Sequence, residues 1–183
     1  EYPEVPSHTV DHFATIADGY PEMALLLAER YTRDDTEESV VEVSDSTIFD
    51  RLLVGDEQDA PELRAVKRIL TPFAFFDRIN WSDNESHRQW IVRAFNLKSD
   101  YSDEVISEVV QYEKNRGVLS GDDVLSLRTI PLATYLMRSA LERDASILDS
   151  IFHESCPPRL LWSFGERIPY ANTIDQAVEW STI

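Results

Sequence analysis

The chain has 183 residues and a mass of 21.0 kDa, enough for one ordinary domain or two small ones. Its 34 acidic residues outnumber 17 basic ones, which gives a formal net charge of −17 and a pI near 4.5. Nucleic-acid binders and proteins of anionic membrane surfaces need clustered Lys and Arg, so this balance argues against both classes.

The single cysteine, Cys156, excludes an internal disulfide framework and a thiolate zinc cluster. We expect a buried, unreactive thiol there. No apolar run approaches the roughly 18 residues of a membrane-spanning helix, and no signal peptide opens the chain. The sequence starts Glu1-Tyr2-Pro3 without an initiator Met, so we expect a piece of a longer, cytoplasmic protein.

The negative charge is unevenly distributed along the chain. Residues 34–60 carry ten Asp or Glu against one Arg, a net of −9. Residues 61–98 carry seven Lys or Arg against four acids, a net of +3. We expect this basic stretch to dock the acidic one, or another domain. The basic residues are 14 Arg and 3 Lys, and an acid-rich, Lys-poor composition suggests a salt-rich cytoplasm; an ordinary acidic protein is the alternative.

The first expected elements are helices. Apolar residues at helical spacing predict one helix over residues 8–17 and a second from Pro21 to about Arg33, with Gly19 at the corner between them. A short helix over residues 46–54 follows, and residues 55–60 form a loop. We take residues 1–58 as a first domain, a small helical bundle.

Three further helices and a hairpin are predicted next. The helices run over residues 61–75, from about residue 83 to 96, and from a Ser102 cap to residue 115. The period then changes from 3.6 to 2, and residues 118–120 and 124–127 flank a Gly-Asp-Asp turn, which predicts a β-hairpin.

Three helices followed by a hairpin is the order of a winged helix. With a helix opening at Pro131, this second domain spans residues 59–145. The C-terminal segment, residues 146–183, is predicted helical in short pieces over residues 146–154, 157–166 and 173–181. The expected fold class is therefore mainly α: a helical bundle, a winged-helix domain with one β-hairpin, and further C-terminal helices.

No catalytic constellation is visible in the sequence. The chain contains no phosphate-binding loop, no nucleophile elbow and no His-Glu-x-x-His motif. His8 and His12 have zinc-compatible spacing but no third ligand nearby, and His153 and Cys156 lack an orienting group. We predict no catalytic residue and no metal site in this chain.

A winged helix raises the question of DNA binding. The third helix would enter the major groove, and the hairpin tip would contact the backbone. Both elements are acidic here. The side chains concerned are Asp103, Glu104, Glu108 and Glu113 in the helix and Asp122 and Asp123 at the tip. Like charge would meet phosphate, so we expect no nucleic-acid partner.

Four short segments, spread over residues 7–145, resemble one protein family. They are Gly19-Tyr20-Pro21 followed by Ala24-Leu25-Leu26-Leu27-Ala28, then Leu70 to Ile79, then Asn115-Arg116-Gly117, and finally Ile130-Pro131-Leu132-Ala133. The first resembles the helical lid of STAND-type P-loop ATPases, which are AAA-like signal-transduction proteins. The others resemble the winged-helix region that follows this lid.

The resemblance implies a lid and winged helix that close over a nucleotide held by an upstream P-loop domain. Gly19 and Pro21 match the lid positions near the nucleotide, ATP or ADP with Mg²⁺ in the parent. The P-loop is absent from this chain, so we expect a non-enzymatic fragment of an ATPase, without its own cofactor. Its expected partners are the upstream domain, other protein domains and further copies in a parent oligomer, and the setting would be antiviral defence.

Two functions from other classes remain open. The first is an acidic winged-helix module for protein–protein interaction. The second, which the charge distribution disfavours, is a winged-helix transcription regulator.

Overall fold

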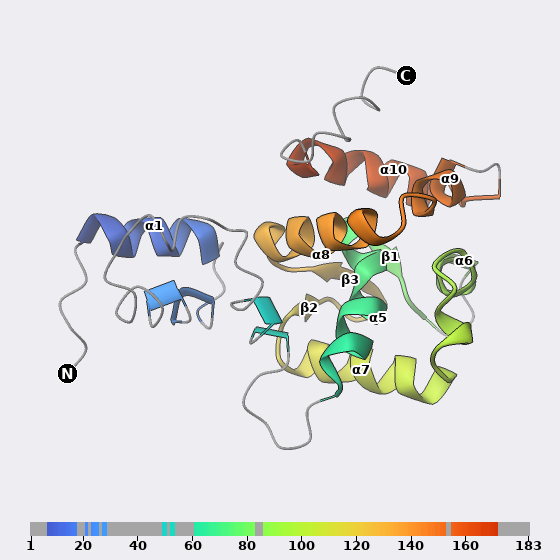
Figure 1. Ribbon diagram of the computed structural model, residues 1–183, viewed down its shortest axis with the longest axis horizontal. Helices are drawn as coiled ribbons and strands as arrows, with labels where there is room; N and C mark the ends of the chain where they lie inside the picture. Colours follow the sequence, from blue (N-terminus) through green and yellow to red (C-terminus); the bar gives the residue numbers. More distant parts are fainter. Residues whose placement is uncertain are drawn as a thin grey trace.

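The structure, a computed structural model, describes residues 7–17, 61–82, 86–152 and 155–171. It also describes residues 21, 23–25, 27–28, 49–50 and 52–53. The described chain is mainly helical and contains one small antiparallel sheet of three strands (Figure 1). The mainly helical class is therefore confirmed, and the sheet has one strand more than the predicted hairpin.

The described helical positions of the N-terminal region lie within the predicted helices or one residue before them. Helix α1 spans Ser7–Ala17 and buries Phe13 and Ala17, whereas Val10 is half exposed. Met23 and Leu27 occupy helical positions and are buried. The helix predicted over residues 46–54 is present at residues 49, 50, 52 and 53.

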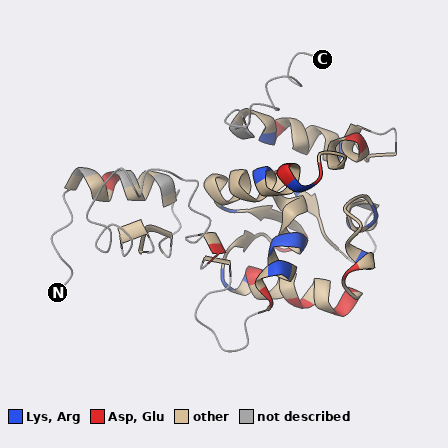
Figure 2. Cartoon of the chain, in the orientation of Figure 1, with Lys and Arg blue, Asp and Glu red and all other residues tan. Residues whose placement is uncertain are grey.

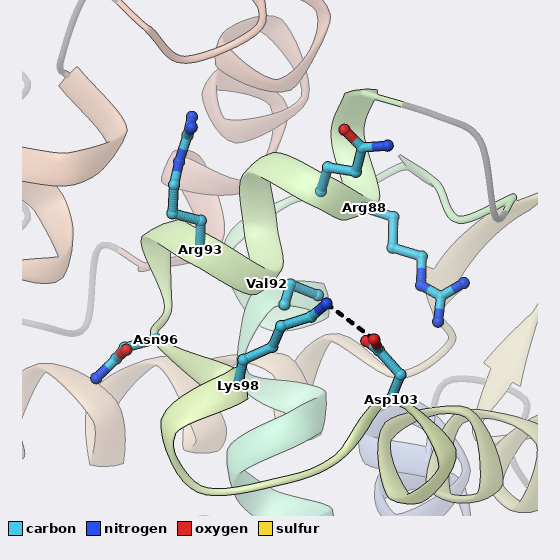
Figure 3. Close-up of a pocket in the computed structure, with 7 residues that line it drawn as sticks. Arg88, Val92, Arg93, Asn96, Lys98 and Asp103 are labelled. Carbon is cyan, nitrogen blue, oxygen red and sulfur yellow. Dashed lines mark ion pairs between the residues drawn. The ribbon is translucent and has the colours of Figure 1, made fainter.

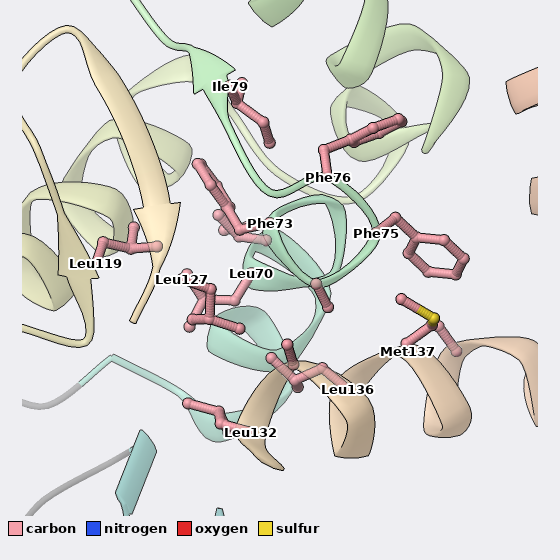
Figure 4. Packing of buried hydrophobic residues seen from close by; sticks show 14 of the residues in the cluster. Leu70, Phe73, Phe75, Phe76, Ile79, Leu119, Leu127, Leu132, Leu136 and Met137 are labelled. Carbon is pink, nitrogen blue, oxygen red and sulfur yellow. The ribbon is translucent and has the colours of Figure 1, made fainter. Parts of the chain in front are cut away.

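Helix α5, Leu63–Phe75, is the centre of the larger helical part. It packs against α7, Asp103–Asn115, and α8, Ile130–Arg143, and it also contacts β3. The residues from Ala65 to Phe75 that face these neighbours are fully buried (Figure 4). Apolar side chains at three- and four-residue spacing form this buried stripe, as the sequence indicated.

Helix α6 spans Ser86–Ala94 and stops two residues before the predicted end, while its predicted start near residue 83 lies outside the described residues. Helix α7 starts and ends where its signals predicted. Asn96 follows α6 with a φ of +50°, a conformation that Asn tolerates better than most residues, and the short 3₁₀ helix η1, Leu97–Ser99, comes next. Ser102 caps α7, since its Oγ accepts a hydrogen bond from the Val105 N–H at 3.4 Å.

The predicted hairpin is present. Strand β2, Leu119–Ser120, pairs antiparallel with β3, Val124–Leu127, and Leu119 faces Leu127 in the register. Strand β1, Ile79–Asn80, pairs with the other edge of β3 and gives the order β1-β3-β2. We predicted no strand between the helices over residues 61–75 and 83–96. A two-residue strand has no period to detect, and its pairing depends on residues 44 and 46 positions further along the chain.

The C-terminal part shares the core of α5. Helix α9 spans Ile147–Phe152, α10 spans Pro158–Arg167 and η2 spans Ile168–Ala171. Ser163 of α10 forms two hydrogen bonds with Arg78, which lies between α5 and β1. The Ser163 Oγ accepts from the Arg78 N–H at 2.6 Å and donates to the Arg78 carbonyl at 3.0 Å. The helix predicted over residues 173–181 lies outside the described residues, and the three-domain division stays a prediction.

No helix in the described part of the chain has both the length and the apolar surface needed to cross a bilayer.

Candidate functional site

The two residues predicted to contact nucleotide are only partly covered by the structure. Gly19 lies outside the described residues. Pro21 occupies a helical position and is exposed. Their nucleotide contact stays a prediction. The acidic stretch, residues 34–60, meets the helical part of the protein at a different place.

That meeting point is residues 49, 50, 52 and 53, called here the anchored segment. Phe49, Leu52 and Leu53 have the i, i+3, i+4 spacing of one helix face, and all three are buried. The ring of Phe49 stacks on Tyr135 of α8, with centroids 4.7 Å apart and planes at 16°. The anchored segment is thus part of the core and not a surface appendage.

A charged network holds Asp50, in the anchored segment, between α5 and α8. Asp50 Oδ1 lies 2.5 Å from Lys67 Nζ and accepts a hydrogen bond from Tyr135 Oη at 2.9 Å. Lys67 Nζ also donates to Tyr135 Oη at 2.7 Å. Each of the three groups contacts the other two, so the carboxylate has a fixed position.

The surroundings change the acidity of both partners of Asp50. Burial by itself would lower the pKa of Lys67, but its hydrogen bonds to Asp50 and Tyr135 outweigh this and raise the pKa. Burial raises the pKa of Tyr135. Lys67 therefore stays charged and Tyr135 stays protonated at neutral pH, the states that hold Asp50.

Arg116 makes a second attachment from the C-cap of α7. Its Nη2 donates to the Leu52 carbonyl at 2.5 Å and its Nη1 donates to the Leu53 carbonyl at 2.7 Å. Nη1 also lies 3.4 Å from Glu113 Oε2, and the guanidinium stands 5.4 Å above the ring of Tyr112. The planar fork of arginine suits this task because it can reach two oxygens at once.

These contacts test the prediction that the basic stretch, residues 61–98, docks the acidic stretch, residues 34–60. It is confirmed for Asp50, the acidic residue that the structure describes there, and Lys67 is its basic partner. The position of Glu113 was predicted wrongly. We placed it on the surface of the third helix, but it is fully buried beside Arg116. Its charge therefore takes no part in the outer face of α7.

The outer face of α7 and the hairpin tip are acidic, as predicted (Figure 2). The exposed side chains are Asp103, Glu104 and Glu108 on the helix and Asp122 and Asp123 at the tip. Phosphate groups would meet negative charge at both elements. The absence of a nucleic-acid partner stays a prediction.

Cys156 is buried, and burial raises its pKa to about 11, so the thiol is protonated at neutral pH. Among the described residues no group of three His, Cys, Asp or Glu could hold a metal ion. The side chains of His8 and His12 lie outside the description, as does His153.

The chain matches no protein-family model, no curated protein and no solved structure.

Neither attachment of the anchored segment was predicted from sequence. Asp50 and Tyr135 are 85 residues apart, and Arg116 and Leu53 are 63 apart. A partial signal existed: the charge reversal at residue 61 indicated docking, and Arg116-Gly117 was singled out as a motif. A sequence pattern cannot predict which main-chain carbonyls an arginine will contact, because every residue has a main-chain carbonyl.

Proposed function

We propose that this chain is a non-catalytic regulatory module of a larger STAND-like nucleotide-switch ATPase. It would relay the nucleotide state of an upstream P-loop domain to assembly or to an effector. A role in antiviral defence follows from the same resemblance.

The anchored segment is the observation that carries this proposal. A relay needs a rigid connection between the part that senses nucleotide and the part that moves. Buried apolar side chains, a carboxylate with two hydrogen-bond partners and an arginine fork fix this segment on α5, α7 and α8. A displacement of the preceding region would therefore be transmitted to the helical core.

The order of elements supports the winged-helix assignment of residues 59–145, of which the structure describes residues 61–82 and 86–145. Helix α5 is followed by β1, α6, α7, β2 and β3, and β3 lies between the other two strands. A winged helix likewise has a strand after its first helix that pairs with the hairpin. The acidic face of α7 favours a protein-facing use of this fold over a DNA-facing one.

The proposal is tested in the full-length parent. A P-loop should lie within about 250 residues upstream of this chain, a span suited to one nucleotide-binding domain. The parent should bind ADP or ATP, whereas this chain alone should neither bind nor hydrolyse them. Absence of an upstream P-loop, or ATP hydrolysis by the isolated chain, would overturn it.

A coupling variant sharpens the test. Asp50→Asn with Lys67→Gln removes the charges of the network but keeps the buried apolar contacts. Nucleotide affinity of the parent should stay unchanged, while nucleotide-dependent hydrogen exchange in residues 61–167 should be lost. Arg138→Gln with Glu142→Gln removes an exposed ion pair of α8, at 2.9 Å, and serves as the matched control. Equal responses of the two double variants would contradict a relay through Asp50.

The second candidate function rests on the exposed carboxylates of α7 and the hairpin tip. An acidic interaction module would bind a basic protein through Glu104, Glu108 and Asp122. Such a complex should dissociate above roughly 0.5 M salt, where the Debye length is a few ångströms. Binding that persists at high salt would count against this function.

A further inference from the structure

A pocket opens between α6, η1 and the start of α7, with a volume of about 700 Å³ (Figure 3). It is separate from the anchored segment and takes no part in the proposed relay. Its polar lining comprises the cations Arg88, Arg93 and Lys98, the amides Gln89 and Asn96, and the carboxylate Asp103. We call it the basic pocket.

The charge of the basic pocket is opposite to that of the molecule. Three cations against one carboxylate leave a net of +2, in a chain whose net charge is −17. Cationic side chains and amide groups are the donors with which proteins hold anionic oxygens. The lining thus has the chemistry of an oxyanion site.

One side of the basic pocket already holds a carboxylate. Lys98 Nζ lies 2.8 Å from Asp103 Oδ2, and Figure 3 shows Arg88 extending toward the same group. The hydrogen bond from Lys98 lowers the pKa of Asp103, and the positive charge of Arg88 contributes to this. The pocket therefore stabilises an anionic oxygen group in its present state.

Neighbouring contacts hold Arg88 in place. Its Nη2 donates to Ser107 Oγ of α7 at 3.2 Å, and its guanidinium lies 5.7 Å from the ring centroid of Trp81. A cation that is positioned beforehand loses less conformational entropy when a ligand binds.

The other side of the basic pocket is lined by Arg93 and Asn96. Both are exposed, and Figure 3 shows them on the side away from Asp103. A ligand with a single anionic group would contact one side only. A ligand with two such groups can contact Arg93 on one side and compete with Asp103 for Lys98 on the other.

We propose that the basic pocket binds a small molecule with at least two anionic oxygen groups, whether phosphate or carboxylate. The volume is within the range of small-molecule sites, about 300–1,000 Å³. A long polyanion such as RNA would extend over the exposed carboxylates Glu104 and Glu108 on the adjacent α7 and be repelled. The surroundings thus favour a compact ligand.

Nuclear magnetic resonance titration of the chain with pyrophosphate, inorganic phosphate and citrate tests this proposal. Pyrophosphate should bind more tightly than phosphate, and the amide shifts should be confined to residues 88–103. Citrate separates the two sources of anionic oxygen. Tight citrate binding assigns the site to polycarboxylates, and weak citrate binding assigns it to phosphates; both outcomes support an oxyanion site.

Variants identify the binding side chains. Arg93→Gln and Lys98→Gln should each weaken pyrophosphate binding about fivefold, the loss expected for one charge-assisted hydrogen bond near a surface. Asp103→Asn removes the competing carboxylate and should strengthen binding. Arg138→Gln makes the same charge change on exposed α8 and should have no effect.

Three results would overturn the proposal. The first is that Arg138→Gln weakens pyrophosphate binding as much as the pocket variants do. The second is that neither pyrophosphate nor phosphate binds at about 10 mM. The third is that a single-stranded oligonucleotide binds more tightly than pyrophosphate. Circular dichroism of each variant checks that the helices remain intact.

Discussion

Arg116 joins two parts of the chain with one side chain. It contacts the main chain of the anchored segment and, at the same time, neutralises the buried carboxylate of Glu113. Leu52, Leu53 and Glu113 are all buried. If Arg116 were lost, water could not replace its hydrogen bonds to these residues unless the structure rearranged. Charge pairing and backbone anchoring therefore depend on the same residue.

Replacing this residue should be costly. Arg116→Ala should lower the free energy of unfolding by about 3 kcal/mol, because it leaves Glu113 as a buried charge without its cation. Arg116→Lys keeps the charge but not the fork and should cost less. Urea unfolding measures both, with Arg138→Ala on exposed α8 as the control. A loss below that of Arg138→Ala would contradict the role given to Arg116.

Cys156 makes a pH-dependent contribution to stability. Its pKa is about 11 in the folded protein, above the ordinary value of 9.0, because burial disfavours the thiolate. The unfolded chain ionises first, so this stability is full below pH 9 and is lost as the pH rises from 9 toward 11.

Unfolding by urea at pH 8 and pH 10 detects this loss. The wild type should lose about 1 kcal/mol more than Cys156→Ala between the two values. The native thiol should also react slowly with a thiol reagent at pH 8 and rapidly in urea. Equal pH dependence of the two proteins would contradict the stated cause.

Two glycines, Gly121 and Gly165, differ in whether a larger residue can replace them. At the hairpin tip, Gly121 has a φ of +103°, and a Cβ there would lie within van der Waals overlap of the Val124 carbonyl oxygen, at 2.0 Å. In α10, a Cβ on Gly165 would have no neighbour within 4 Å. The same substitution should therefore destabilise one element and stabilise the other.

Thermal unfolding of the two alanine variants compares them directly. Gly121→Ala should cost about 2 kcal/mol because the turn must leave its conformation. Gly165→Ala should add about 0.5–1 kcal/mol, the helix-propensity difference between the two residues. A stable Gly121→Ala protein would show that the hairpin tip is not fixed in the stated geometry.

The helices and strands differ in how accurately their positions can be predicted from the sequence. Helices α5, α7 and α8 have long apolar periods and clear starts, such as Ser102, and they were predicted within about two residues, the usual scatter of helix ends. Strand β1 and helix η1 are too short to have a period. Glu113 was misplaced because charge predicted exposure, while its burial depends on Arg116.

Across the whole molecule, some basic side chains bind groups inside the fold while acidic side chains remain on the surface. Lys67 and Arg68 of the basic stretch bind groups inside the fold, the Asp50 carboxylate and the Phe95 carbonyl. The outer face of α7 keeps its negative charge exposed. The net charge of −17 produces a net electrostatic repulsion within the chain, which destabilises the compact state.

Salt should relieve this repulsion. The melting temperature at pH 7 should rise as KCl increases from low concentration to about 1 M, where the Debye length is near 3 Å. Near the pI of 4.5 the net charge vanishes, and the same addition should have little effect. Equal melting temperatures in low and high KCl at pH 7 would exclude both this repulsion and the salt-rich origin suggested by the composition.

Arg116 holds the anchored segment by carbonyl oxygens, which every amino acid supplies. Positions 52 and 53 can therefore exchange among apolar residues of similar size during evolution, while position 116 has to remain arginine. Such a contact leaves no pair of co-varying columns in an alignment. Methods that infer contacts from covariation will miss this attachment, and an invariant arginine will be its only sign in an alignment.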